Sequence, residues 1–96
     1  ETAALLGIDA ADRPLWLDDG YVGPGYAQIS KDGLAAVHTA ARRDGVLLDT
    51  TYTGKAMAGL MALVSTGQIR RGANVVFVHT GGLPELFARD PGELLP

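Results

Sequence analysis

The sequence contains no cysteine, so it offers neither a disulfide framework nor a thiolate metal site. Its two histidines, His38 and His79, lie too far apart to form a ligand motif, and we expect no metal centre. Basic residues number 8 against 11 acidic ones, which argues against nucleic-acid or anionic-membrane partners bound through bulk charge. No apolar run approaches a membrane span and the first residues are not the basic start of a signal peptide, so we expect a cytoplasmic protein.

Apolar residues are plentiful, at 47% of the 96, which argues against disorder. This length allows one domain at most and lies near the lower limit for a self-sufficient core. Residues 3–6 followed by Gly7 are typical of a helix end with a glycine C-cap, and no methionine precedes Glu1. We therefore expect the numbering to begin inside a longer polypeptide.

Two apolar runs, residues 46–48 and 75–78, each end at a polar loop that leads into a helical pattern. This order predicts a right-handed parallel βαβα unit of the α/β class. Open α/β folds bind ligands outside the carboxyl ends of their strands. We therefore expect residues 49–54 and 79–84 to meet at a ligand site on one edge of the sheet.

Helix signals flank these runs. Met57, Leu60, Met61 and Val64 recur at the spacing of a core-facing stripe, which predicts a helix over residues 54–65. Ser30 is a good N-cap, and it predicts a second helix that runs to about Arg43. The remaining predictions are a strand at 15–17, a loop at 20–27, an apolar stripe of Leu34, Val37 and Ala41, helix stops at Gly45 and Gly67, and a last helix beginning at Leu83–Pro84.

Hydroxyl groups and glycines dominate the two polar loops. Tyr52, Thr53 and Thr80 supply hydroxyls that donate and accept, and Gly54 and Gly81 let a ligand approach the backbone. Helices starting near residues 54 and 83 would aim free N–H groups at the same edge, which suits an anion or a carbonyl oxygen. The same threonines also suit N-caps and the same glycines tight turns, so a structural role stays open.

Two further residues have alternative interpretations. Lys55 lies in a first helical turn, where a cation opposes the helix dipole, and this indicates either a carboxylate partner or a solvated side chain. His79 at a strand end fits a hydrogen-bonded structural role better than a chemical one.

The loops and their flanks resemble one family over nearly the whole chain. Residues 47–60 and 77–88 are similar to the C-terminal end of D-cysteine desulfhydrases and aminocyclopropane-carboxylate deaminases, which are pyridoxal-phosphate enzymes of the tryptophan-synthase-β type. The Gly-Pro-Gly-Tyr loop at residues 23–26 matches that group's tyrosine loop. Ala27 replaces the usual glycine after the tyrosine, and Thr50-Thr51 replaces a usual Pro-Val, so fine substrate preference stays open.

The resemblance implies roles for individual residues. Tyr26 and Tyr52 match the tyrosines that face substrate and cofactor, and are the candidate catalytic residues. Thr80 matches the threonine whose hydroxyl meets the pyridine nitrogen. Thr53 stands where the deaminases carry glutamate and Thr80 where they carry leucine; a hydroxyl leaves that nitrogen largely neutral, which favours α,β-elimination over ring-opening. The candidate cofactor-binding residues are Thr53, Gly54, Thr80 and Gly81.

The family's Schiff-base lysine and phosphate-binding loop have no counterpart in this sequence, and Lys55 matches a different position. The resemblance therefore implies that residues 1–96 are the C-terminal portion of the pyridoxal-phosphate-binding catalytic domain, within a fold-type II three-layer sandwich. We expect the isolated chain to be inactive, and the whole enzyme to be a homodimer in which the N-terminal part completes the site.

The expected reaction converts D-cysteine, a small amino-acid substrate, to pyruvate, ammonia and sulfide. Aminocyclopropane-carboxylate deaminase and cysteate sulfo-lyase remain alternatives within this class. A non-catalytic α/β module that binds a small anion at its helix N-termini is the alternative from another class.

Overall fold

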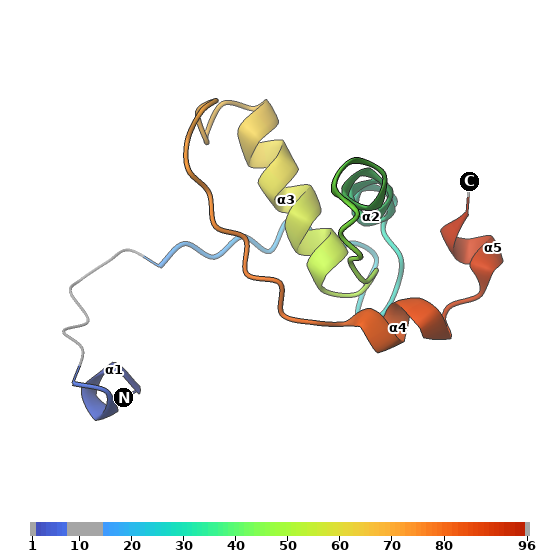
Figure 1. Cartoon of the computed structure of the whole chain (residues 1–96), viewed down its shortest axis with the longest axis horizontal. Coiled ribbons are helices and arrows are strands. Elements are labelled where there is room, and N and C mark those ends of the chain that lie inside the picture. The colour runs from blue at the N-terminus through green and yellow to red at the C-terminus, as the bar shows by residue number, and fades with distance from the viewer. Residues whose placement is uncertain (1, 8–14, 96) are drawn as a thin grey trace.

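The structure, a computed structural model, describes residues 2–7 and 15–95. α2 and α3 pack side by side at the centre, and the chain before α4 runs alongside α3 as an extended segment (Figure 1). The helices in the described part of the chain are α1 (Thr2–Leu5), α2 (Lys31–Asp44), α3 (Thr53–Ser65), α4 (Leu83–Ala88) and α5 (Pro91–Leu94).

α2 begins and ends where the sequence predicts. The Ser30 hydroxyl accepts a hydrogen bond from the Gly33 N–H at 3.1 Å, and Asp32 places a negative charge in the first turn. Gly45 closes the helix in the left-handed conformation at φ 65°, and its N–H bonds to the Ala41 carbonyl. Both end signals are confirmed.

The other predicted helices are confirmed as well. α3 covers residues 53–65, and Gly67 follows it with a φ of 78°. α4 begins with Pro84 in its first turn, where a missing N–H costs nothing. Gly7 follows α1 with a φ of 63°, as expected at a helix end. α5, which the Asp90 side chain caps, has no counterpart among the predictions.

The predicted apolar stripe of α2 is only partly right. Val37 is buried, but Leu34 and Ala41 are only half-buried, and the buried positions beside Val37 are Ala36 and Ala40. The α2 side chain that lies against Gly54 of α3 is Val37.

The predicted stripe of α3 is also only partly right, since Met57 packs against the core of Val37, Ala40 and Leu48. Its methionines and Leu60 are half-buried and Val64 is 39% exposed, while Ala58 and Gly59 are buried. Gly54 shows how close the helices lie, since a Cβ there would stand 2.7 Å from the Val37 side chain. The covered face of α3 is set by its packing against α2 and not by packing on a sheet.

The predicted parallel βαβα unit is not confirmed, because none of the described residues forms a strand. Residues 15–17, 46–48 and 75–78 have no ladder of backbone hydrogen bonds within the described chain. A strand exists only through bonds to neighbouring strands, and a parallel sheet is covered on both faces. Here the side chains that a sheet would bury stay exposed, Leu15 at 95% and Val76 at 89%.

The two runs expected to form adjacent strands nevertheless approach each other through their side chains. Leu48 is fully buried with Val37 and Ala40 in the core, and Phe77 packs against this cluster. The His79 ring also bonds to the Leu47 carbonyl. These contacts bring the two polar loops together without a sheet.

Within residues 2–7 and 15–95, no helix is long and apolar enough to cross a bilayer.

Candidate active site

A pocket of about 470 Å³ opens between the Gly-Pro-Gly loop, the start of α3 and the segment that precedes α4. Its volume falls in the range of small-molecule sites, about 300–1,000 Å³. The hydroxyl-bearing side chains of Tyr26, Tyr52 and Thr80 share its wall with the apolar side chains of Phe77 and Val78. Apolar walls with a few convergent polar groups suit a small organic ligand.

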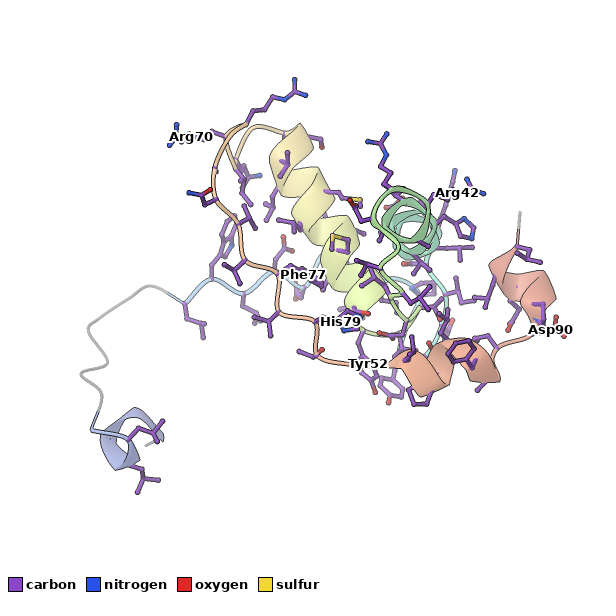
Figure 2. The ribbon with its side chains drawn as sticks, in the orientation of Figure 1. Arg42, Tyr52, Arg70, Phe77, His79 and Asp90 are labelled. Atoms are coloured by element: carbon purple, nitrogen blue, oxygen red, sulfur yellow. The ribbon has the colours of Figure 1, made fainter. Side chains whose placement is uncertain are left out.

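Tyr26 and Tyr52 meet on this wall. Their hydroxyls form a hydrogen bond, and the rings lie edge to face with centroids 6.0 Å apart. Figure 2 shows Tyr52 at the end of the molecule where α3 and α4 both begin. The hydrogen bond to Tyr26 raises the pKa of Tyr52, and desolvation and the nearby negative charges act in the same direction. The Tyr52 hydroxyl therefore keeps its proton at neutral pH.

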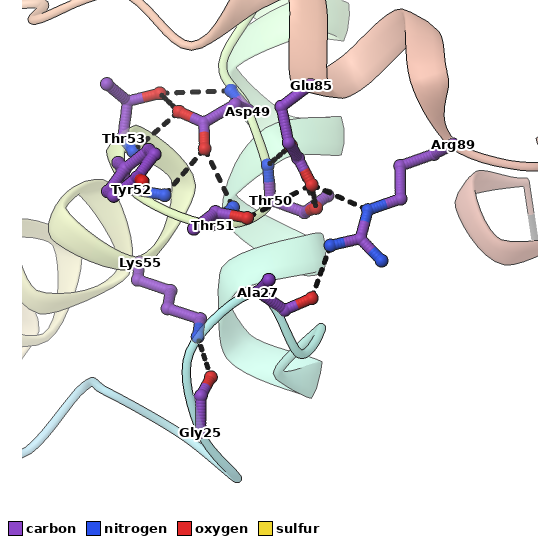
Figure 3. A network of polar contacts seen from close by, with 10 residues as sticks. All are labelled: Gly25, Ala27, Asp49, Thr50, Thr51, Tyr52, Thr53, Lys55, Glu85 and Arg89. Carbon is purple, nitrogen blue, oxygen red and sulfur yellow. Dashed lines mark hydrogen bonds and ion pairs between the residues drawn. The ribbon is translucent and has the colours of Figure 1, made fainter.

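The Asp49 carboxylate holds the loop that carries Tyr52 (Figure 3), and the whole residue is buried. Burial by itself raises the pKa of Asp49, but the hydrogen bonds that the carboxylate accepts outweigh burial and hold the pKa below its usual value. The charged group complements the positive end of the α3 dipole. Its donors are the N–H groups of Thr51 at 2.7 Å, Tyr52 at 2.6 Å and Thr53 at 2.8 Å, and the Thr53 hydroxyl at 2.6 Å.

This arrangement corrects the expectation that α3 aims free N–H groups at a ligand. The Asp49 carboxylate takes the donors at the helix start, and the Gly54 N–H bonds to the Asp49 carbonyl at 2.9 Å. The chain itself thus supplies the negative charge that such a helix start attracts. Because Asp49 occupies these donors, the start of α3 gives little support to the hypothesis of a non-catalytic module that binds a small anion.

Glu85 on α4 binds the same loop from the other side. Its carboxylate accepts the Thr50 N–H at 3.1 Å and the hydroxyls of Thr50 and Thr51 at 2.9 and 3.1 Å. Arg89 donates to Glu85 at 2.6 Å and to the Ala27 carbonyl (Figure 3). Burial alone raises the pKa of Glu85, but its hydrogen bonds with Arg89 and the threonines hold the pKa below its usual value. The threonines that replace the family's Pro-Val thus have a partner.

Lys55 has neither of the environments predicted from its place on the helix. Its side chain is only 7% exposed, and Nζ donates to the carbonyls of Val22 at 2.6 Å and Gly25 at 3.0 Å. Backbone oxygens take the place of the expected carboxylate. These bonds tie the first turn of α3 to the Gly-Pro-Gly loop.

His79 is hydrogen-bonded, as expected of a core histidine, but the residue is exposed and does not lie in the core. Its Nε2 bonds to the Leu47 carbonyl at 2.8 Å, and Nδ1 accepts the Gly81 N–H at 3.1 Å, which places the ring proton on Nε2. Gly82 follows with a φ of 98°, and a Cβ there would lie 2.3 Å from an Asp49 carboxylate oxygen. Only glycine lets the two polar loops approach this closely.

Four of the six candidate site residues line the pocket and two do not. Gly54 is buried between α2 and α3, and Gly81 lies in the turn beside His79. Both glycines use their N–H groups inside the chain, so their contact with a cofactor stays a prediction. The four residues in the pocket wall are Tyr26, Tyr52, Thr53 and Thr80.

The sequence reasoning missed the acidic and basic side chains that position these residues. Asp49 directly precedes threonines and a helical pattern, which is a recognisable capping signal. Glu85 and Arg89 stand four residues apart on a predicted helix, the spacing of an ion pair. The second signal does not tell which distant loop Glu85 and Arg89 will bind.

Comparison with known proteins shows the family of the chain. The family model described as pyridoxal-phosphate dependent enzyme matches residues 2–81. The chain is 43% identical over 91 residues to the D-cysteine desulfhydrase of Yersinia enterocolitica, a match that covers 95% of the chain and 28% of that protein. It is 47% identical over 81 residues to the enzyme of the same name from Klebsiella pneumoniae strain 342, covering 84% and 24%. It is 46% identical over 89 residues to that of Serratia proteamaculans, covering 93% and 27%.

The chain spans about a quarter of the length of these curated relatives. The family match, by contrast, extends over most of the chain and includes both polar loops up to Gly81. The chain therefore belongs to the family of pyridoxal-phosphate dependent enzymes.

Proposed function

We propose that this chain is the C-terminal part of a pyridoxal-phosphate-dependent lyase that catalyses α,β-elimination on a small β-substituted amino acid. With D-cysteine, one molecule of substrate and one of water give pyruvate, ammonia and hydrogen sulfide. The observation that carries the proposal is the hydrogen bond between the hydroxyls of Tyr26 and Tyr52 on a pocket wall that also holds Thr80. The name that the curated relatives share supports D-cysteine as the substrate.

The residues of the pocket fit the cofactor. Phe77 and Val78 offer an apolar wall to a flat aromatic ring, and the Thr80 hydroxyl has no hydrogen-bond partner among the described residues. That hydroxyl would hold the pyridine nitrogen, whereas the Thr53 hydroxyl already donates to Asp49. When bound, the cofactor supplies an electron sink that makes the α-hydrogen of an amino acid acidic.

The tyrosine pair would serve the substrate side. In the elimination, a base outside these residues takes the α-proton and the bond between Cβ and sulfur breaks, so the sulfur departs as hydrosulfide and takes up a proton. The Tyr52 hydroxyl, which keeps its proton at neutral pH, would hydrogen-bond to the departing sulfur and assist its protonation. The shared hydrogen bond lets Tyr26 resupply the proton of Tyr52. Proton transfer by a positioned group contributes about 10²–10⁴-fold in rate.

The proposal extends to the parts of the enzyme outside these residues. A lysine and a phosphate-binding loop from the N-terminal part would complete the site within one catalytic domain. The whole enzyme would be a homodimer. Residues 15–17, 46–48 and 75–78 would then become strands of the three-layer α/β sandwich. The exposed apolar side chains of these segments, among them Leu15 at 95% and Val76 at 89%, support such a covered state.

The experiment that tests this function uses the full-length protein that contains this chain. We expect the purified protein to show the visible absorbance of protein-bound pyridoxal phosphate, and borohydride to attach the cofactor covalently to a lysine outside residues 1–96. A protein without this absorbance that binds inorganic phosphate would contradict the proposal and favour a simple anion-binding module.

A further inference from the structure

Two cationic side chains from different helices hold the loop that carries Tyr26 (Figure 3). Lys55 on α3 donates to the Val22 and Gly25 carbonyls, and Arg89 after α4 donates to the Ala27 carbonyl. The bonded carbonyls of residues 25 and 27 belong to the neighbours of Tyr26 on either side. The position of the tyrosine therefore depends on both cations.

The other contacts of this loop lie away from Tyr26: the Tyr21 ring packs on Gly59, and the Val22 N–H reaches the Asp19 carbonyl only at 3.4 Å. Residues 20–27 contain turns but no helix or strand, and within the loop the Gln28 N–H reaches the Gly25 carbonyl only at 3.3 Å. Ala27 has a φ of 57°, in the left-handed region that alanine rarely adopts. A backbone conformation of this kind persists when surrounding contacts determine it.

Both cations also reach back to the loop of Tyr52. Lys55 stands on the first turn of the helix that follows Tyr52 and is 7% exposed. Arg89 pairs with Glu85 at 2.6 Å, and Glu85 accepts hydrogen bonds from residues 50 and 51. The polar network thus connects the Tyr26 loop to the Tyr52 loop on two sides of the pocket.

We propose that Lys55 and Arg89 are positioning residues that hold the Tyr26 hydroxyl against the Tyr52 hydroxyl and thereby set the rate of the reaction. The inference rests on the function proposed above. It assigns the two cations no contact with the reacting atoms, so their whole effect on the rate passes through Tyr26.

A double-mutant cycle in the full-length holoenzyme tests this dependence. We expect Arg89→Gln and Lys55→Met each to lower kcat for sulfide release from D-cysteine by about 10–100-fold, the cost of misplacing a reacting group by roughly 1 Å. In a Tyr26→Phe background, which has no hydroxyl left to position, the same changes should alter kcat by less than about twofold. Arg89→Lys, which can still donate to one carbonyl, should recover part of the loss.

Arg70→Gln is the matched control, because Arg70 is exposed in the turn beyond α3, away from the pocket (Figure 2). It should leave kcat unchanged. Losses from Arg89→Gln and Lys55→Met that multiply fully with the Tyr26→Phe loss would overturn the inference. If Arg89→Gln does not fold, judged by cofactor absorbance and the unfolding midpoint, the cycles with Arg89→Lys and Lys55→Met decide. A parent enzyme without bound cofactor or sulfide release would instead refute the proposed function.

Discussion

The hydroxyl of Tyr26 is hydrogen-bonded to the hydroxyl of Tyr52, 26 positions further along the chain. Tyr26 lies in a loop and Tyr52 immediately before α3, so no single element positions both side chains. Their contact depends on the polar groups around them. Asp49 holds the loop of Tyr52, and Lys55 and Arg89 bond to the loop of Tyr26.

Replacing Tyr52 by phenylalanine in the full-length enzyme should lower turnover by about 10²–10⁴-fold and leave cofactor absorbance intact, because only the hydroxyl is lost. Tyr21→Phe is the comparison within the same pocket wall: the Tyr21 hydroxyl has no hydrogen-bond partner among the described residues, so its loss should lower turnover less. If the Tyr52→Phe enzyme is as active as the parent, Tyr52 has only a packing role.

The raised pKa of Tyr52 has a consequence for the pH profile. The neutral phenol is the active form, and its pKa lies above the ordinary value of 10.0, so the step that uses this proton should persist through neutral pH. Activity that depends on Tyr52 should be lost only in strong alkali. A loss of kcat near pH 8 that disappears in Tyr52→Phe would contradict the assignment.

Asp49→Asn should lower the free energy of unfolding by about 1–3 kcal/mol, because an amide cannot accept from all the donors that the carboxylate satisfies. Urea denaturation of the full-length protein measures the loss. Asp44→Asn, at the exposed end of α2, serves as the control. Equal stability of Asp49→Asn and the parent would show that the buried carboxylate does not hold the loop.

The pH dependence of stability follows from the same carboxylate. Its pKa is lowered in the folded state, so its contribution is fully present above the ordinary value of 3.8 and is lost as pH falls through the folded pKa. Between pH 4 and pH 2 (roughly the window in which such groups protonate), the parent should lose more stability than Asp49→Asn. Parallel curves for the two proteins would exclude this linkage.

Ala27→Gly should stabilise the full-length protein by about 0.5–1 kcal/mol, because the left-handed conformation costs alanine about 1–2 kcal/mol and the added flexibility of glycine offsets only part of it. The same substitution at Ala35, exposed within α2, should destabilise by about 1 kcal/mol. Opposite signs for the two changes in chemical denaturation are the expected result, and equal signs would contradict the strain at Ala27.

Thr80→Val should weaken cofactor binding by roughly 1–3 kcal/mol, because it keeps the shape of the side chain and leaves the pyridine nitrogen without its partner. Titration of the apoenzyme with pyridoxal phosphate measures the change. Thr66→Val is the control, since the Thr66 hydroxyl only caps the end of α3. Unchanged affinity in Thr80→Val would make Thr80 a simple turn residue.

The sequence predicts the helices well because their end signals are local. Ser30, Gly45 and Pro84 act within a turn of their own position, and the structure confirms each of them. It predicts the helix faces less well: Met57 packs against the core as expected, but Leu60 is only half-buried, and Ala58 and Gly59 are the buried positions. Which face of a helix is covered depends on the element that packs against it, and local periodicity does not identify that element.

The strands and the polar network have the same limitation. Residues 46–48 have the composition of a strand, but pairing needs a neighbour, and none is present in the described chain. Four site residues were predicted and do share a pocket wall, yet Glu85 and Arg89 went unnoticed because their partners lie on loops distant in sequence. Long-range contacts of this kind follow only from the assembled structure.

The central claim is that Thr53 and Thr80 line the site of an eliminating lyase, and substrate choice by the full-length holoenzyme tests it most directly. D-cysteine and aminocyclopropane-carboxylate should be compared at equal concentration, with sulfide, pyruvate and 2-oxobutyrate measured as products. We predict that D-cysteine releases sulfide and pyruvate in equal amounts and that the cyclopropane ring opens slowly or not at all. Ring-opening faster than sulfide release would contradict the account.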